Sequence, residues 1–189
     1  MPDTSLSITT PRLVVRRLGP ADLHDILDFL SHPSVARATP EIEATEAGVK
    51  RYIDLQNAYQ PFEQDKCFDL AIERKADGKV IGLLTLVRRE HRQGAIGYAL
   101  AIEHRGHGYA TEAAQALVDY GFGPLALHRI YAETDSGNPA SWRVMERLGM
   151  RREGCLREAV LEDGQWLDHL IYGLLAAEWL AAGRSAPVS

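Results

Sequence analysis

Apolar and polar residues alternate with two different periods along the first sixty residues. In 8–18, apolar side chains alternate with arginines, which predicts a strand. In 21–30 the apolar side chains have helical spacing, and His32-Pro33 predicts the end of that helix. A looser amphipathic pattern over 40–59 predicts a second helix that begins near Thr45.

The rest of the chain continues to switch between these periods. Alternating patterns predict strands over 67–73, 80–88, 94–102, 128–134, 154–161 and 165–174. Helical patterns predict helices over 108–120, 139–148 and 175–182. Asp77-Gly78 and Asp163-Gly164 are typical of hairpin turns, and Gly149 stands where a helix C-cap is expected.

The order of these elements predicts one mixed α/β domain. The strands 67–73, 80–88 and 94–102 follow one another through short connections, which predicts an antiparallel meander. The strand–helix–strand unit 94–134 is a crossover, which places its two strands parallel. Because the chain contains no linker or repeat, we expect a single domain over 8–182 and a disordered tail over 183–189.

Composition narrows the class of protein. Hydrophobic residues make up 46% of the 189 residues, enough to bury a core, and the formal net charge of −5 disfavours a nucleic-acid binder. Cys67 and Cys155 form neither a CxxC pair nor a zinc pattern, which predicts free thiols in the cytoplasm. The N-terminus lacks a signal-peptide pattern, and no apolar stretch approaches the ~20 residues of a membrane span. We therefore expect no membrane association.

Two glycines mark the junction between the strand 94–102 and the helix 108–120. Gly106 and Gly108 permit a tight turn with exposed N–H groups, and the first N–H groups of a helix have no intrahelical partner. With the helix dipole, these groups can bind a pyrophosphate. A glycine turn without a ligand is the alternative. The pattern is neither a Rossmann fingerprint nor a Walker loop.

A second polar junction opens the helix 139–148. Asn138 and Ser141 follow a strand, so either side chain can cap this helix. If the strands before the two junctions are parallel neighbours, both junctions face one cleft, and ligands bind where such strands diverge.

Together the two junctions resemble those of a known family. Residues 105–110, Arg-Gly-His-Gly-Tyr-Ala, resemble the Arg/Gln-x-x-Gly-x-Gly/Ala signature of the GCN-five-related N-acetyltransferase (GNAT) superfamily. Asn138-x-x-Ser141 and the helix after it are similar to that family's second coenzyme A segment. The opening Thr10-Pro11-Arg12-Leu13 and closing Gly154-x-Leu156-Arg157-Glu158 segments resemble the branch of the RimJ and RimL ribosomal-protein acetyltransferases. The resemblance covers about 8–180.

The resemblance implies an acetyl-coenzyme A-dependent N-acetyltransferase, in which a central parallel strand pair splays around the coenzyme and an amine attacks the thioester directly. In the family, a strand N–H polarises the thioester carbonyl. By position this N–H belongs to Leu100, and Ser141 is the family-matched proton donor to the leaving thiolate, so we expect both to be catalytic. The residues expected to bind the coenzyme are Leu100, Ile102, Arg105, Gly106, His107, Gly108, Tyr109, Ala110, Thr111, Asn138 and Ser141.

Other side chains near the junctions leave alternatives open. Glu133 and Asp135, at the end of the second parallel strand, are either a general base or surface charges. Tyr98 and Tyr109 are further candidate proton donors. Ile102 stands where the family often has a proline, which we expect to change the stiffness of the loop and leave binding intact. No set of His and Cys residues completes a metal site, so we expect no metal.

Three functions fit this interpretation. The acceptor is a protein N-terminal amine, or a small amine such as a polyamine, an amino acid derivative or an aminoglycoside; the third reading is a coenzyme A-binding sensor without turnover. A chain terminus, with a pKa of about 7.7–8.0, needs less help from a base than a lysine with a pKa of about 10.4. We expect 20–62 and 160–166 to shape the acceptor site. The strand 165–174 and the helix after it offer a surface for a homodimer.

Overall fold

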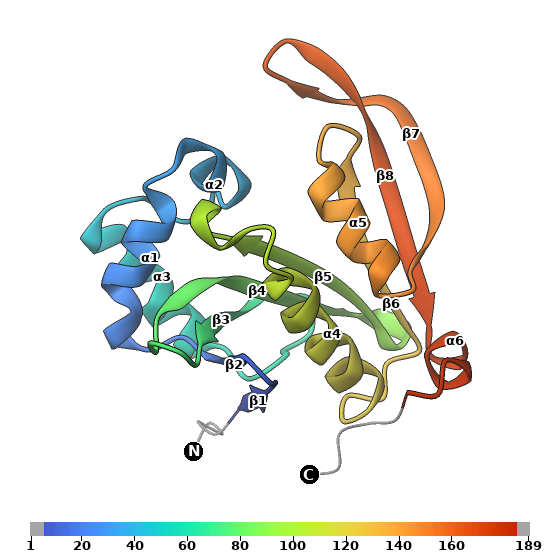
Figure 1. The fold of residues 1–189 in the computed structure, drawn as a ribbon, viewed down its shortest axis with the longest axis horizontal. Coiled ribbons are helices and arrows are strands. Elements are labelled where there is room, and N and C mark those ends of the chain that lie inside the picture. The colour runs from blue at the N-terminus through green and yellow to red at the C-terminus, as the bar shows by residue number, and fades with distance from the viewer. Residues whose placement is uncertain (1–5, 185–189) are drawn as a thin grey trace.

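An eight-stranded sheet is the centre of the computed structural model, which describes residues 6–184 (Figure 1). The strands are β1 (Ser7–Thr9), β2 (Leu13–Arg17), β3 (Phe68–Arg74), β4 (Val80–Arg89), β5 (Gln93–Leu100), β6 (Arg129–Asp135), β7 (Arg151–Glu162) and β8 (Gln165–Leu175). The helices are α1 (Leu23–Leu30), α2 (Pro33–Ala38), α3 (Glu46–Ala58), α4 (Tyr109–Phe122), α5 (Pro139–Arg147) and α6 (Ala176–Ala181).

The strands lie in the order β1-β2-β3-β4-β5-β6-β8-β7. The pair β5–β6 is parallel, and the other neighbouring strands are antiparallel. This order confirms the mixed α/β class, the predicted meander and the crossover through α4. Of the predicted tail 183–189, residues 185–189 lie outside the described residues.

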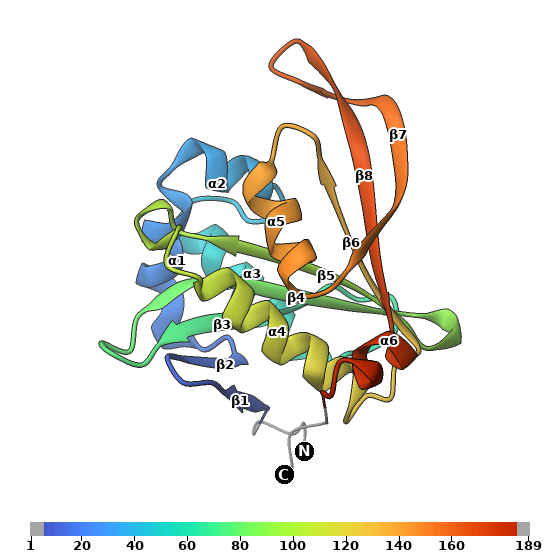
Figure 2. The same cartoon turned by 45° about the vertical axis from the view of Figure 1, so that its right-hand side comes forward.

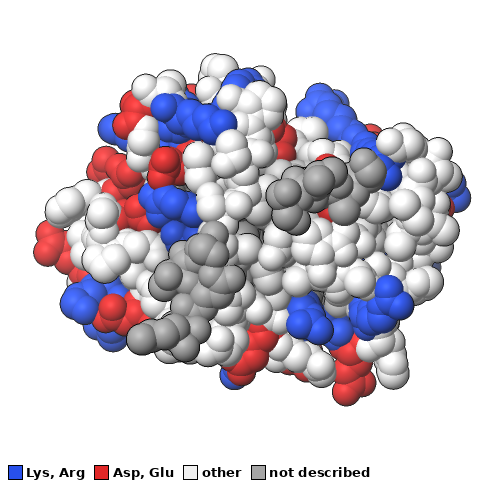
Figure 3. All heavy atoms as spheres, turned by 90° about the horizontal axis from the view of Figure 1, so that it is seen from below, with Lys and Arg blue, Asp and Glu red and all other residues white. Residues whose placement is uncertain are grey.

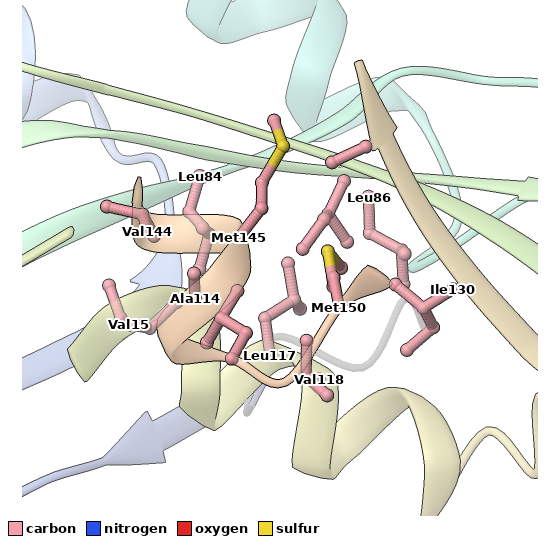
Figure 4. Packing of buried hydrophobic residues seen from close by; sticks show 14 of the residues in the cluster. Val15, Leu84, Leu86, Ala114, Leu117, Val118, Ile130, Val144, Met145 and Met150 are labelled. Atoms are coloured by element: carbon pink, nitrogen blue, oxygen red, sulfur yellow. The ribbon is translucent and has the colours of Figure 1, made fainter. Parts of the chain in front are cut away.

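Helices cover both faces of the sheet between β2 and β5 (Figures 1 and 2). On one face, the even-numbered Leu70, Leu84 and Leu86 belong to a core shared with α4 and α5. Figure 4 shows side chains of these two helices converging on Leu84 and Leu86. On the other face, the odd-numbered Ala71 and Leu83 pack in a core with α1, α2 and α3. The alternation of side chains along each strand therefore separates two cores.

The prediction of one strand over 8–18 is wrong, because the chain reverses within that range. β1 folds back antiparallel onto β2, pairing Ile8 with Val15. The Thr10 hydroxyl accepts a hydrogen bond from Leu13 N (2.9 Å), and Pro11 lies inside the turn. Alternation alone could not distinguish this tight hairpin from one continuous strand.

The region between α1 and α3 contains a helix that the sequence pattern did not predict. Pro33 ends α1 as predicted, but it is also the first residue of α2, because proline suits the first turn of a helix. The helix α3 begins near Thr45 as predicted, and the Thr45 side chain caps it by accepting a hydrogen bond from Gly48 N (3.0 Å). The strand predicted over 94–102 ends at Leu100, since Ile102 begins a 3₁₀ turn.

The hairpin of β7 and β8 extends beyond the rest of the molecule (Figure 1). Leu156, Leu161 and Trp166 on this hairpin are more than half exposed, at 54%, 58% and 60%. On the face near the two termini, acidic and basic side chains are interspersed, and uncharged residues cover much of the surface (Figure 3).

Candidate active site

β5 and β6 pair over only three residues each and then diverge. The parallel pairing joins Gln93–Ala95 to Arg129–Tyr131 and stops there, although β5 continues to Leu100. Ala101 N donates a hydrogen bond to Ile81 O (2.9 Å), which points this amide toward β4. Because backbone groups alternate along a strand, the N–H groups of Tyr98 and Leu100 point the opposite way, toward the gap between β5 and β6. Among the described residues, β6 does not pair with this part of β5, so the amides of Tyr98 and Leu100 edge the gap.

The loop after β5 presents its backbone at the start of α4. Gly106 and Gly108 both have left-handed φ angles, 79° and 81°, which glycine adopts without strain. Gly108 is the N-cap of the 14-residue α4, and the side chains of Arg105 and His107 are exposed. Exposed amides at the positive end of a helix dipole form a site suited to phosphate groups. The predicted pyrophosphate site thus has the backbone geometry it requires.

Arg12 fixes this loop from the turn between β1 and β2. Its Nη1 donates to His107 O (2.9 Å), its Nε to Glu112 Oε2 (2.6 Å), and its guanidinium lies 4.5 Å from the centre of the Tyr109 ring. Burial opposes the ionisation of Glu112, but hydrogen bonds from Thr10 and Arg12 together lower its pKa. Arg12 belongs to the opening segment that resembles the family, but the sequence did not predict it as a site residue.

Across the gap, the start of α5 meets β5. Asn138 Oδ1 accepts a hydrogen bond from Ser141 N (3.1 Å), which is the predicted cap, and Pro139 is the first helical residue. The Tyr98 hydroxyl donates to Ser141 O (2.8 Å) and accepts from Ser141 Oγ (3.3 Å). Burial raises the pKa of Tyr98 to about 12, although the hydrogen bond with Ser141 opposes the shift. The two candidate proton donors therefore form one hydrogen-bonded pair.

A cavity of about 360 Å³ opens beside this pair. Its walls come from the end of α2 and the loop after it, the start of β3, the middle of β4, the second half of β5, the end of β6 and the helix α5 with its cap. It is lined by Ala38, Thr39, Glu41, Asp69, Leu83, Thr85, Ile96, Gly97, Tyr98, Ala99, Glu133, Thr134, Asp135, Asn138, Ser141 and Met145. Four carboxylates, Glu41, Asp69, Glu133 and Asp135, contribute to the lining.

The most deeply buried of these carboxylates belongs to Asp69, which is 5% exposed. Tyr52 OH donates to Asp69 Oδ2 (2.6 Å), Gln56 Nε2 donates to the same oxygen (3.1 Å), and Thr85 Oγ1 donates to Oδ1. Burial raises the pKa of Asp69, while the hydrogen bonds from Thr85 and Tyr52 oppose the rise. Sequence reasoning missed this residue, and a charged residue between Phe68 and Leu70 was the only signal.

The two carboxylates proposed as a general base lie on the same face of the sheet as Asp69. Glu133 Oε2 is 3.4 Å from His169 Nε2, and Asp135 Oδ1 accepts a hydrogen bond from Gly137 N (2.8 Å). Both line the cavity, so the structure brings these candidates to the gap while each also has a structural contact.

The two segments expected to shape the acceptor site approach each other. Arg37, at the end of α2, lies 3.6 Å from Asp163, in the turn between β7 and β8. Both side chains are more than half exposed, so this ion pair adds little stability, but it places the hairpin tip beside the region that lines the cavity.

The other residues predicted to bind the coenzyme lie between the end of β5 and the first turn of α4. Arg105 Nε donates to Leu100 O (3.1 Å), while Ala110 and Thr111 occupy the first turn of α4. Ile102 is 37% exposed in the 3₁₀ turn, outside the strand in which it was predicted. Within 6–184, no group of three His, Cys, Asp or Glu side chains could hold a metal ion. In the same range, no helix is long and apolar enough to cross a bilayer.

Comparisons with known proteins agree with the class that this fold and site define. The family model described as "Acetyltransferase (GNAT) domain" matches residues 12–151. The chain is 31% identical over 176 residues to the uncharacterized N-acetyltransferase YnaD of Bacillus subtilis (strain 168), covering 92% of this chain and 99% of that protein. It is 26% identical to the [ribosomal protein uS5]-alanine N-acetyltransferase of Escherichia coli (strain K12), covering 91% and 92%.

Among solved structures, a GNAT-family acetyltransferase from Bacillus anthracis superposes with a TM-score of 0.78 and 27% identity, covering 92% of this chain and 100% of that one. The chain belongs to the GNAT family of acetyltransferases. Acetyltransferases of this fold use acetyl-coenzyme A, and the glycine loop and the amides of Tyr98 and Leu100 fit such a donor.

Proposed function

We propose that the chain transfers the acetyl group of acetyl-coenzyme A to the N-terminal amine of a protein, by direct attack in a ternary complex. One observation carries the proposal. The gap between β5 and β6 has at one end a glycine loop with left-handed Gly106 and Gly108 at the start of α4, and beside its centre a carboxylate-lined cavity. A donor and an amine can therefore meet at the Tyr98–Leu100 edge.

On the donor side, the backbone holds and polarises the substrate. The N–H groups of 106–110 bind the pyrophosphate, and Arg105 adds a positive charge. The N–H of Tyr98 pairs with the pantetheine arm as a neighbouring strand would. The N–H of Leu100 donates to the thioester carbonyl oxygen, where negative charge develops during attack.

The Tyr98–Ser141 pair supplies a proton to the leaving thiolate. Tyr98, with a pKa of about 12, keeps its proton at neutral pH, and Ser141 Oγ lies 3.3 Å from its oxygen. The amine attacks in its neutral form, after its ammonium form has lost a proton to solvent. As the carbon–sulfur bond breaks, a proton passes from one of these hydroxyls to the sulfur, and the proton that the acylated nitrogen loses replaces it. Asn138 holds Ser141 in place through the cap of α5.

The N-terminal acceptor is supported by the similarity to the uS5-alanine acetyltransferase, which spans nearly the full length of both chains. The four carboxylates of the cavity favour a second candidate, a small polycationic amine such as a polyamine. Both candidates are cationic amines, and they differ in size and in the number of charges.

Release of coenzyme A thiol from acetyl-coenzyme A tests the proposal. The panel contains peptides with free and with blocked N-termini, spermidine, amino acid amides and an aminoglycoside. We expect turnover with a free N-terminus and none with the blocked peptide. Turnover with spermidine alone would identify the second candidate. Tight binding of acetyl-coenzyme A without thiol release across the panel would indicate a sensor and contradict the proposal.

We also propose that the protein works in the cytoplasm and that it forms a homodimer. Cys67 and Cys155 are both free and exposed, which supports a reducing compartment such as the cytoplasm. The exposed Leu161 and Trp166 of the β7–β8 hairpin support pairing of two copies. Light scattering of the purified chain measures the mass directly, and a monomer at all concentrations would contradict the homodimer.

A further inference from the structure

Asp69 carries a buried carboxyl group whose hydrogen-bonding partners are all neutral. Its donors are a phenol, an amide and a hydroxyl, from Tyr52, Gln56 and Thr85. Within the described residues 6–184, no Lys, Arg or His forms an ion pair with it. All three donors point hydrogens at its oxygens, an arrangement that suits the ionised carboxylate. In its ionised form, Asp69 is therefore a negative charge without a counter-ion among the described residues.

The strand register places Asp69 in a row of paired residues that leads to the gap between β5 and β6. Asp69 pairs with Thr85 across β3 and β4, and Thr85 pairs with Gly97 across β4 and β5. Directly paired residues face the same side of a sheet, so the three positions form a row that ends at the edge of β5. Gly97 has no side chain to cover the end of the row, and all three residues line the cavity.

The other carboxylates of the cavity are in different surroundings. Glu41 and Glu133 are exposed, so water and salt screen their charges, and Glu133 already lies beside His169. Asp135 accepts a hydrogen bond within its own turn. Asp69 is shielded from solvent, and its field acts mainly on what enters the cavity.

We propose that Asp69 is the specificity-determining residue for the acceptor, and that its charge selects cationic primary amines over uncharged molecules of the same shape. This inference rests on the proposed function, because it assigns the cavity to the amine. It concerns binding of the ammonium form and assigns no proton transfer to Asp69.

Calorimetry on the coenzyme A-saturated protein tests the inference without requiring turnover. The probes are alanyl-alaninamide, which is cationic, and lactyl-alaninamide, which has a hydroxyl in place of the amine. We expect the wild type to bind the cationic probe at least about tenfold more tightly, and Asp69→Asn to remove most of that preference. Asp28→Asn removes the same charge from an exposed position on α1 and should leave the preference unchanged.

Two further measurements separate a role in specificity from a role in folding. Tyr52→Phe removes a donor to Asp69 but keeps the charge, so it should retain the preference. Coenzyme A should bind Asp69→Asn as it binds the wild type. An unchanged preference in Asp69→Asn, or an equal loss in Tyr52→Phe, would overturn the inference. Selective binding of the cationic probe without release of coenzyme A thiol would support the inference about Asp69 and contradict the proposed function.

Discussion

The proposed donor side and acceptor side of the gap between β5 and β6 present different chemical groups. The first presents backbone amides, and the second presents side chains. In the proposed complex, the groups on the donor side that face the ligand are backbone amides from one continuous segment, 98–110. On the acceptor side they are side chains from β3, β4 and β6, and Asp69 is held there by a hydrogen bond from Tyr52 on α3. In this proposal the donor, which is the same molecule for every acceptor, is bound by backbone atoms. The side chains of the acceptor side can therefore change without altering the backbone amides of the donor side.

A backbone site should be most sensitive to a change in backbone conformation. Gly106→Ala strains the loop, because φ is 79° and a left-handed residue other than glycine costs about 1–2 kcal/mol. Among the described residues no atom lies within 4 Å of the added Cβ, so the strain acts without a clash. We expect calorimetry to show coenzyme A affinity reduced about tenfold.

Gly149→Ala is the matched control for this prediction. Gly149 also has a left-handed φ of 86° and open space around its Cβ position, but it lies at the far end of α5. The two variants should lose similar stability, and only Gly106→Ala should lose affinity. Equal affinities in both variants would show that the loop is not a backbone site.

Tyr98 lies between the proposed donor and acceptor sides. Removing its hydroxyl should slow acetyl transfer and leave the binding of coenzyme A unchanged. Tyr98→Phe removes the hydroxyl that contacts Ser141, so we expect kcat to fall about tenfold with coenzyme A affinity unchanged. Because the pKa of Tyr98 is raised to about 12, its proton is lost only as pH approaches 12, and the wild-type rate should show no loss from this group below pH ~11. Tyr59→Phe, away from the gap, should keep full kcat. Wild-type turnover by Tyr98→Phe would exclude the hydroxyl as proton donor.

The smallest effect is expected at Arg12, which supports the donor side from outside. Its guanidinium is half exposed, with 47% of the side chain accessible, so its contacts with His107 O and Glu112 are partly screened. We expect Arg12→Ala to weaken coenzyme A binding about threefold in the same titration. Arg12→Lys keeps the charge but not the paired contacts, and it should resemble Arg12→Ala. Full affinity in Arg12→Lys would show that charge, not tethering, is what Arg12 supplies.

The difference between the backbone groups of one side and the side chains of the other also explains what the sequence could predict. The glycines at 106 and 108 and the cap at Asn138 are encoded by neighbouring residues, so the loop, the cap and the parallel strand pair were predicted. The Asp69 cluster depends on strand register and on the packing of α3, which no local pattern reports. In sequence, Phe68-Asp69-Leu70 is typical of a strand with one face in solvent, whereas α3 covers that face.

Two smaller differences have local physical causes. Proline at position 33 can end one helix and begin the next, so the pattern predicted two helices where the structure has α1, α2 and α3. The Thr10 hydroxyl replaces a ladder hydrogen bond inside the predicted strand 8–18, and this turn brings Arg12 to the loop at His107.

The most direct test of the central claim is a titration of coenzyme A into the ¹⁵N-labelled chain, followed by the backbone amide resonances. The account predicts the largest shifts at Tyr98, Leu100 and 106–110, with the amides of β7 near Leu156 unmoved. Shifts centred instead on the separate hollow beside Arg89 and Tyr131, with 106–110 unchanged, would contradict it.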